Sequence, residues 1–469
     1  MENKMTALPV LKIMGHRTAK QVQNHCNNLN RLVALDNSTL TPVEVMWMYA
    51  GDTSGVMDSA FIDTASHKAL SISAAGYTTV ILRPFNIAEI DDCYEFTLTP
   101  NATFVVKDDH TISGWGPGYS YLPVPAQENH DVAIIHPGFR AATALRTDHS
   151  IFAWGLPSTG GELKISDAQR TDVTDIQMAL SMGLLQGSTE PTVSQWGAGS
   201  DGSNQTPAEI SSRTDIKKIL TAGSAQVALT QSGQILEWGS NATFALPAEI
   251  VALTDVQDIY ISNSAGVALR KTGQLAAWGI PQTGGTLPDD IAALTDVERV
   301  IPGYQSFVAL RKNGAVVCWG QDFALPPGMT SLTGIVHAVY GLSEKPLPFA
   351  YEGCSVLDSN GQVYSWYGPG IEMSVPAGLS NVVALTTNGF YSFAALKSDG
   401  SVVAWGTDIS GDTSPVDGLL NDVQAIYPIT QGYLALKANG TMVAWGNPDI
   451  QSDNASIPAD LQGLVTYQY

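Results

Sequence analysis

Charged residues are scarce in this 469-residue chain: they make up 14% of it, and the 44 acidic residues outnumber the 23 basic ones. The net charge of −21 repels phosphate backbones and no basic patch occurs, so we expect no nucleic-acid binding. No apolar run is long enough to span a membrane, so we expect no membrane insertion. The N-terminus lacks the pattern of a secretory signal, which predicts a cytoplasmic protein unless a non-standard route exports it.

Cysteine and the common catalytic motifs are also rare or missing. The four cysteines, Cys26, Cys93, Cys318 and Cys354, are far apart and form no CxxC pair, which excludes a disulfide-stapled scaffold. HExxH, GxSxG and GxxxxGK[ST] do not occur, and the eight histidines show no metal-ligand spacing. We therefore expect no metal, no cofactor and no enzymatic activity.

A tryptophan repeat dominates what the sequence does contain. Nine of the ten tryptophans recur at steps of 39, 42, 42, 40, 41, 47, 39 and 40 residues, and eight of the nine are followed by Gly. The framed residues are Trp115, Trp154, Trp196, Trp238, Trp278, Trp319, Trp366, Trp405 and Trp445. Copies such as VALRKTGQLAAWG and AALKSDGSVVAWG share the same order of apolar, turn and aromatic positions. A period of this length indicates a repeat architecture instead of several unrelated domains.

Each copy reads as a small antiparallel sheet of three or four strands. The runs DVQDIYI and GVALRK alternate with period two, as strands do. KTG, SDG and ANG place Gly at a hairpin position that needs a positive φ, and His110 and His149 occupy that position in the first two copies. The Trp should close the last strand and pack between neighbouring sheets. The Pro about ten residues later should begin a loop or a short edge strand.

One such sheet cannot bury both of its faces, so the copies must stack. A 40-residue antiparallel unit favours radial stacking over a linear solenoid. The sequence thus predicts an all-β fold: a single β-propeller of about nine blades, or of seven or eight if a copy is used otherwise. We expect it to span residues 67–469.

The two ends depart from the frame. Residues 1–66 are expected to form an N-terminal extension of uncertain structure, in which QVQNHCNNLNRLVALDN could be a short helix or an irregular piece. AAGYTTVILR at 74–83 is similar to a repeat copy, so a truncated copy could precede the first full one. The final IPADLQGLVTYQY has the form of half a copy, and we expect Val465–Tyr469 to close the ring by pairing with N-terminal strand material.

The strings ALKSDGSVVAWG and VPAGLSNVVAL resemble the repeat of the regulator-of-chromosome-condensation superfamily. The short period is most similar to its compact bacterial branch, which includes the β-lactamase inhibitory propeller. The resemblance implies a disc-shaped propeller that binds proteins through loops on one face. Chromatin-bound members have longer repeats and a basic surface, and the β-lactamase inhibitor has fewer repeats. The resemblance therefore implies neither of these specific activities.

The loop between the first two strands of each copy is the predicted binding surface, because it varies while its flanks do not. The aligned loops read Gly138-Phe139-Arg140, Asn263-Ser264, Gly303-Tyr304-Gln305, Gly389-Phe390-Tyr391 and Thr430-Gln431. Aromatic residues and Arg are typical of interface hot spots. We expect Phe139, Arg140, Asn263, Tyr304, Gln305, Phe390, Tyr391 and Gln431 to contact a partner.

Three functions remain open from the sequence. The first is a non-catalytic protein-binding propeller, acting as an inhibitor, an adaptor or a component of a bacterial toxin or effector assembly. The second is a carbohydrate-binding propeller, which would need exposed tryptophans. The third is an enzyme with a site at the channel mouth.

Overall fold

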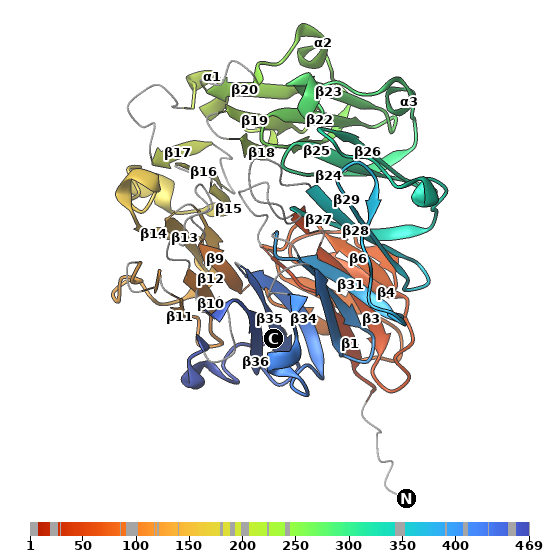
Figure 1. Ribbon diagram of the computed structural model, residues 1–469. Helices are drawn as coiled ribbons and strands as arrows, with labels where there is room; N and C mark the ends of the chain where they lie inside the picture. The colour runs from red at the N-terminus through yellow and green to blue at the C-terminus, as the bar shows by residue number, and fades with distance from the viewer. Residues whose placement is uncertain are drawn as a thin grey trace, which may run out of the picture.

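Small antiparallel sheets follow one another along the chain (Figure 1). The computed structural model describes residues 8–18, 27–28, 30–84, 86–90, 102–116, 118–119, 122–138, 140–178, 182–187, 193–197, 206–222, 225–239, 244–342, 352–389, 392–406, 411–429, 431–448 and 456–468. Among these residues, nine sheets each contain one framed tryptophan and two further sheets precede them. The predicted all-β fold of small antiparallel blades is confirmed.

Each tryptophan sheet, named here by its Trp, contains a first, a middle and a third strand in chain order. The first strands are β9 (Ile87–Ile90), β12 (Val132–Pro137), β15 (Val173–Met178), β18 (Ile216–Ala222), β21 (Val256–Ile261), β24 (Val297–Pro302), β27 (Ile335–Leu342), β31 (Val382–Thr387) and β34 (Val423–Ile429). The middle strands are β10 (Ala102–Val106), β13 (Ala141–Arg146), β16 (Met182–Gly187), β19 (Ala225–Thr230), β22 (Ala265–Arg270), β25 (Ser306–Arg311), β28 (Glu352–Asp358), β32 (Ser392–Lys397) and β35 (Gly432–Lys437). The third strands are β11 (Ile112–Trp115), β14 (Ile151–Gly155), β17 (Ser194–Gly197), β20 (Ile235–Gly239), β23 (Leu275–Gly279), β26 (Val316–Gly320), β29 (Val363–Tyr367), β33 (Val402–Gly406) and β36 (Met442–Gly446). In the Trp366 sheet, β30 (Ile371–Glu372) and β2 (Asn27–Asn28) extend the two edges.

The hairpin between the middle and third strands follows the predicted turn chemistry. Gly273 has φ 80° and Gly440 has φ 78°, and the histidines that replace glycine adopt the same left-handed geometry, with φ 62° at His110 and 68° at His149. A Cβ at position 273 would lie 2.5 Å from the carbonyl oxygen of Thr295 in the next repeat, so glycine also allows close packing there.

In three copies the proline element is an α-helical turn, which corrects the expected loop or edge strand there, whereas Pro125 and Pro376 each begin a loop with a simple turn. Pro207, Pro247 and Pro288 each precede a single α-helical turn, and an Ile one turn on is buried in the core. The α-helical turns are α1 (Ala208–Ser211), α2 (Ala248–Val251) and α3 (Asp289–Ala292). The 3₁₀ turns are η2 (Pro157–Thr159), η3 (Asp167–Arg170), η5 (Pro281–Thr283), η6 (Pro327–Met329), η8 (Ser414–Val416) and η11 (Ala459–Leu461). Proline suits the start of a helical turn because its missing N–H would be unpaired there anyway.

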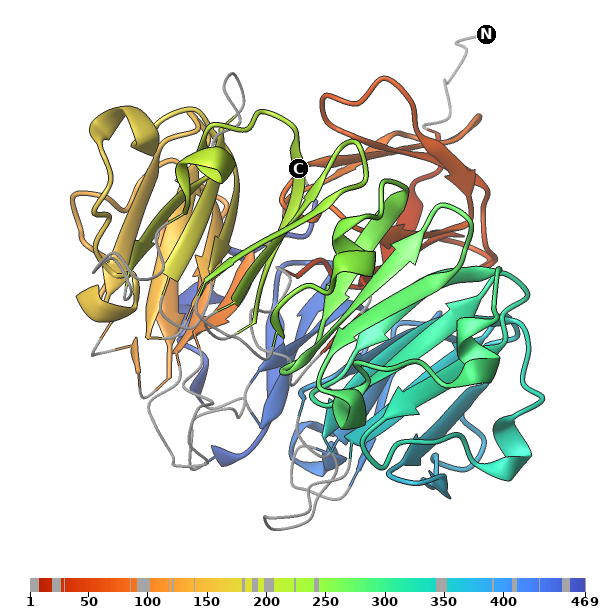
Figure 2. The ribbon, with the colours of Figure 1, turned by 90° about the horizontal axis from the view of Figure 1, so that it is seen from above.

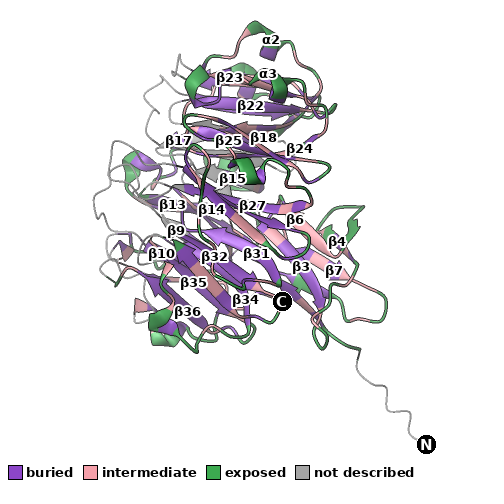
Figure 3. Ribbon diagram, turned by 45° about the vertical axis from the view of Figure 1, so that its right-hand side comes forward, coloured by how far each residue is buried: buried purple, intermediate pink, exposed green. Residues whose placement is uncertain are grey.

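The framed tryptophans pack between successive sheets, as predicted. All nine are buried, with exposed fractions between 0% and 6%. Trp278, for example, shares a core cluster with Val227 and Leu229 of the preceding sheet. The same arrangement holds at each following interface, and the strand interiors are correspondingly buried (Figure 3).

The last and first tryptophan sheets share a core in the same way. Leu434 and Leu436 of the Trp445 sheet lie in one hydrophobic cluster with Trp115, together with the buried residues Leu461 and Val465 of the C-terminal segment. The series of sheets therefore returns to its own beginning, as a propeller ring does.

The C-terminal segment completes the first strand position of the Trp115 sheet. Asp108 donates its backbone N–H to the carbonyl oxygen of Leu464 at 2.9 Å, which is the bond that Lys271 makes to Asp255 within an ordinary sheet. Gln468 forms an antiparallel bridge with Leu82. The segment thus contacts strand material from the N-terminal part of the chain at these two points. The first strand position is shared between two distant parts of the chain, because β9 continues the same edge of β10.

Residues 11–82 form two sheets of their own. One contains β1 (Leu11–Met14), β3 (Asn30–Asp36) and β6 (Ala60–Asp63), and the other contains β5 (Val56–Asp58), β4 (Val45–Tyr49), β7 (Leu70–Ser73) and β8 (Val80–Leu82). Their facing residues, including Leu32, Trp47 and Ile72, form one core. We call these residues the N-terminal unit; its red strands group at one side of the molecule (Figure 2).

Two expectations about this unit need correction. The segment QVQNHCNNLNRLVALDN contains strand β3 and the short β2 instead of a helix, because its alternating NRLVALD end buries one side of a sheet. The boundary expected at residue 66 falls inside the four-stranded sheet, where β4 pairs with β7. The similar stretch 74–83 supplies β8 to that sheet and does not form a separate copy.

The N-terminal unit is attached to several tryptophan sheets. Gly15 donates its N–H to the carbonyl oxygen of Gln424 at 2.9 Å, and the guanidinium of Arg31 donates to the carbonyl oxygen of Val383. β2 pairs with β27 along the edge of the Trp366 sheet. The unit thus joins three sheets that lie far from it in sequence.

A buried ion pair lies within the N-terminal unit. The Arg17 guanidinium is 2.6 Å from the Asp63 carboxylate, and both side chains are at most 1% exposed. Arg17 also donates to the carbonyl oxygens of Lys68 at 2.8 Å and Arg83 at 2.5 Å. A movement that broke these bonds would leave a buried charge without a partner, which costs several kcal/mol. The network therefore holds residues 17, 63, 68 and 83 in a fixed arrangement.

We expect the free energy of unfolding to fall as the pH drops below 6.5. Burial lowers the pKa of His16 to about 4 and that of His136 to about 3, so both are neutral when folded, whereas the unfolded chain protonates near 6.5. The two neutral histidines therefore contribute fully to the free energy of unfolding above pH 6.5. As the pH falls from 6.5 toward 4, the free energy of unfolding decreases by up to about 1.4 kcal/mol per pH unit for each histidine. Asp63 faces His16, and His67 faces His136.

Urea unfolding between pH 5 and pH 7 measures this dependence. His16→Asn should reduce the slope, because it removes a group that is neutral in the folded state and protonates in the unfolded chain. Equal slopes in the variant and the unchanged protein would contradict the assignment to His16.

Candidate functional site

The predicted binding loops join the first strand of each tryptophan sheet to its middle strand. They therefore lie at the opposite end of each sheet from the glycine hairpins. Of the predicted residues, Arg140 and Asn263 are exposed, and Tyr304, Gln305 and Gln431 are half-buried. Phe139, Phe390 and Tyr391 lie outside the described residues.

A shared hydrogen bond fixes these loops. The residue that follows the Trp-Gly pair donates its N–H to the carbonyl oxygen just before the middle strand. Arg140, Ser264, Gln305 and Gln431 all accept this bond, at 2.9 to 3.0 Å. Arg140 and Gln431 also adopt positive φ values of 51° and 47°. The loop backbones are thus ordered before any partner binds, which lowers the entropic cost of association.

Three neighbouring loops join into one strip. Asn263 of the Trp278 sheet donates its N–H to the carbonyl oxygen of Tyr304 in the Trp319 sheet at 3.1 Å. Gln305 donates its N–H to the carboxylate of Glu352 in the Trp366 sheet. We call residues 263, 304, 305 and 352 the loop strip.

Buried groups support the strip from below. The hydroxyl groups of Tyr340 and Ser306 are 2.9 Å apart across two sheets. Burial raises the pKa of Tyr340 and also that of Glu352. The sequence analysis missed Tyr340 and Glu352. One usable signal was Gly303, where a Cβ would lie 2.1 Å from the Tyr340 ring.

The same support recurs at the Trp405 sheet. Tyr433 of the following sheet places its hydroxyl 2.9 Å from that of Ser392 and accepts a bond from the N–H of Asn388 at 3.3 Å. A tyrosine from the next repeat thus fixes the start of the middle strand in both places.

Groups suited to covalent or metal chemistry do not gather in the described part of the chain. No cluster of three His, Cys, Asp or Glu residues could hold a metal ion there. Cys318 and Cys354 are free thiols; burial raises the pKa of Cys318 to about 12 and also raises the pKa of Cys354 well above its ordinary value. Such thiols stay protonated at neutral pH and are poor nucleophiles. In the same residues, no helix is long and apolar enough to cross a membrane.

The tryptophans do not provide sugar-stacking surfaces. All nine framed rings are buried between sheets, and Trp47 is buried in the N-terminal unit. The exposed tryptophans that a lectin-like reading required are therefore not present.

Comparisons with known proteins match this chain at the level of structure. No protein-family model and no curated protein match its sequence. Prp20p from Saccharomyces cerevisiae is 11% identical over 78% of this chain and 92% of that one, with a TM-score of 0.36. Yeast RCC1 (Prp20) bound to Kap60 is 13% identical over 60% of this chain and 71% of that one, with a TM-score of 0.34.

A plant structure is similar to the same degree. The CRINKLY WD40 ectodomain of the Arabidopsis thaliana receptor kinase ACR4 is 15% identical over 59% of this chain and 94% of that one, with a TM-score of 0.36. Identities and scores this low carry no argument about function, and they do not test the resemblance to the bacterial branch.

Proposed function

We propose that this chain is a non-catalytic protein-binding propeller that acts as an inhibitor, an adaptor or a component of a toxin or effector assembly. The loop strip is the observation that carries this proposal. It offers an aromatic ring and several amide groups on a backbone that is held by hydrogen bonds within and between sheets. Such preorganised surfaces are typical of protein recognition.

The charge of the chain indicates the kind of partner. With a net charge of −21, the protein attracts basic surfaces and repels acidic ones over a distance of about 8 Å at physiological salt. We therefore expect a partner with a basic contact surface, and association that slows as salt is added.

Affinity capture from cells of the source organism, followed by mass spectrometry, tests the proposal. Tyr304→Ala should weaken binding of the captured partner by about 2 kcal/mol, roughly thirtyfold in Kd. It should change the free energy of unfolding by less than about 1 kcal/mol, because the ring is only half-buried.

The matched control lies at the other end of the neighbouring sheet. Thr272→Ala changes an exposed side chain in the glycine hairpin of the Trp278 sheet and should leave partner binding unchanged. If both variants bind the partner as the unchanged protein does, the loop strip is not the binding surface. Failure to recover any partner would remove the support for a protein-binding function.

A further inference from the structure

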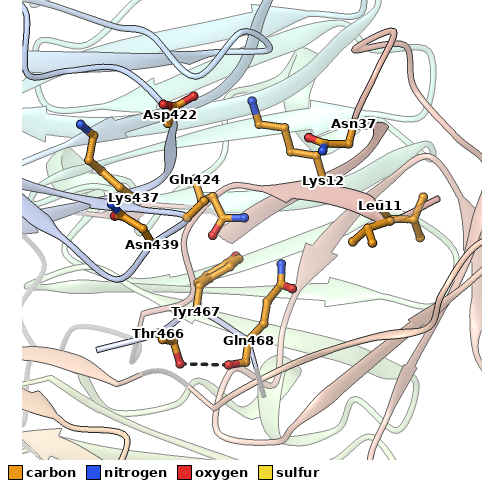
Figure 4. Close-up of a pocket in the computed structure, with 12 residues that line it drawn as sticks. Leu11, Lys12, Asn37, Asp422, Gln424, Lys437, Asn439, Thr466, Tyr467 and Gln468 are labelled. Atoms are coloured by element: carbon orange, nitrogen blue, oxygen red, sulfur yellow. Dashed lines mark hydrogen bonds between the residues drawn. The ribbon is translucent and has the colours of Figure 1, made fainter. Parts of the chain in front are cut away.

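A polar cavity of about 520 Å³ lies between the N-terminal unit, the Trp445 sheet and the C-terminal segment (Figure 4). Its walls come from β1, from the start of β34, from the hairpin after β35 and from the last residues of the chain. The polar lining residues are Lys12, Asn37, Asp422, Gln424, Lys437, Asn439, Thr466 and Gln468. The cavity lies at the glycine-hairpin end of the sheet, away from the loop strip.

Gln424 is the first sign that the cavity is a binding site. This residue is 93% buried, at 7% exposure, yet its side-chain amide makes no hydrogen bond with any residue that the structure describes. Figure 4 shows the amide pointing into the space between Asp422, Lys12 and Tyr467. The amide lines the cavity, so a ligand there can hydrogen-bond to both its N–H donor and its carbonyl acceptor.

Asp422 is the second sign. In the Trp278 and Trp319 sheets, the Asp before the first strand pairs with the Arg that ends the middle strand, at 3.0 and 2.9 Å. In the Trp445 sheet the corresponding residues are Asp422 and Lys437. Lys437 bonds instead to the side-chain oxygen of Asn421 at 3.0 Å, and within the described residues the Asp422 carboxylate has no hydrogen bond or ion pair. The pair seen in those two sheets is thus not formed here, and Asp422 is exposed at the edge of the cavity.

Two ammonium groups stand on either side of that carboxylate. Figure 4 shows Lys12 and Lys437 flanking Asp422 at the rim. The Lys12 ammonium is 3.4 Å from the carbonyl oxygen of Ser398, a long contact that leaves its other donors unused. Burial lowers the pKa of Lys12, and the nearby carboxylates of Asp422 and Asp399 oppose this shift.

We infer that this cavity binds a sugar acid, a short saccharide that carries a carboxylate. Side-chain amides both donate and accept, so they suit hydroxyl groups that do the same. A free carboxylate accepts hydroxyl protons, while two ammonium groups attract one ligand carboxylate. Leu11 and Tyr467 give the apolar contact that a sugar ring also needs.

The mixed lining argues against other ligand classes. A simple anion could pair with the two ammonium groups but would leave the Asp422 carboxylate and the amides of Gln424 and Gln468 without partners, and a neutral apolar ligand would leave all of these groups unpaired. The volume lies within the usual range for small-molecule sites, about 300 to 1,000 Å³, and exceeds what a single small ion requires.

Isothermal titration calorimetry of the full chain with trigalacturonate tests the inference, with maltotriose and succinate as comparison ligands. We expect saturable binding of trigalacturonate that is at least about tenfold tighter than that of either comparison ligand. Gln424→Leu and Lys437→Met should each weaken it about tenfold. Lys437 is half-buried at the surface, so the second variant keeps the test valid if the first does not fold.

Two matched controls come from other repeats. Lys397 ends the middle strand of the Trp405 sheet as Lys437 ends that of the Trp445 sheet, but it pairs with Asp399 outside the cavity. Gln257 occupies the bulge position of Gln424 in the Trp278 sheet and is exposed. Lys397→Met and Gln257→Leu should bind trigalacturonate as the unchanged protein does. No binding of trigalacturonate, equal binding of maltotriose or succinate, or equal losses in the control variants would overturn the inference.

Discussion

Removal of Leu461–Tyr469 is expected to abolish cooperative unfolding. Leu461, Val465 and Tyr467 are buried at 2%, 0% and 5% exposure in the core that joins the last tryptophan sheet to the first. Each contributes about 1.5–3 kcal/mol by leaving water, so their joint loss is comparable with the whole stability of a typical domain. The truncation also exposes a backbone edge at Asp108, which favours aggregation.

Thermal and urea unfolding followed by circular dichroism, with size-exclusion chromatography for aggregation, measure this effect. Leu464→Ala is the control within the same segment, because that side chain is 43% exposed and should cost less than about 1 kcal/mol. A truncated chain that melts as the full chain does would show that the ring does not depend on this segment.

Trp278→Ala is expected to destabilise the fold by about 3–5 kcal/mol. The ring is 1% exposed, packs edge-on against Phe244 with 6.1 Å between ring centroids, and lies over Gly266 of its own sheet. Truncation would leave a large cavity between two sheets that other hydrogen bonds hold in place, so collapse can fill it only in part. Trp278→Phe should cost less because most of the volume is kept.

Equilibrium urea unfolding of Trp278→Ala beside Tyr304→Ala separates core from surface aromatics. Tyr304 is half-buried, so its truncation should cost less than about 1 kcal/mol. If Trp278→Ala were as stable as the unchanged protein, the inter-sheet role of the framed tryptophans would be wrong.

Local rules explain why so much of the repeat could be predicted. Strand alternation, the positive φ at Gly273 or His110 and the burial of Trp278 each depend on residues close in sequence. The Trp recurs in nine copies and the positive φ in the eight copies whose hairpin the structure describes. The proline element was harder, because a Pro followed by a short apolar run suits a helical turn as well as an edge strand. Only its packing in the core decides between them.

The remaining features depend on contacts between distant residues. Tyr340 supports the loop strip through Ser306, and the cavity that Gln424 lines is formed by the N-terminal unit, the Trp445 sheet and the C-terminal segment together. The N-terminal unit does not contain the repeat, so each of its sequence patterns occurs only once. One occurrence of a short apolar pattern did not distinguish a strand from a helix. The prediction that residues 139, 390 and 391 contact a partner stays a prediction.

The shared first strand of the Trp115 sheet has a consequence for synthesis on the ribosome. One part of that strand, β9, emerges early, whereas Leu464–Gln468 emerges more than 370 residues later. While those residues are being translated, β10 has an incomplete neighbouring strand. At about 5–20 residues per second, that interval lasts on the order of 20 to 80 seconds, during which the nascent chain depends on its own N-terminal unit or on chaperones to shield the open edge.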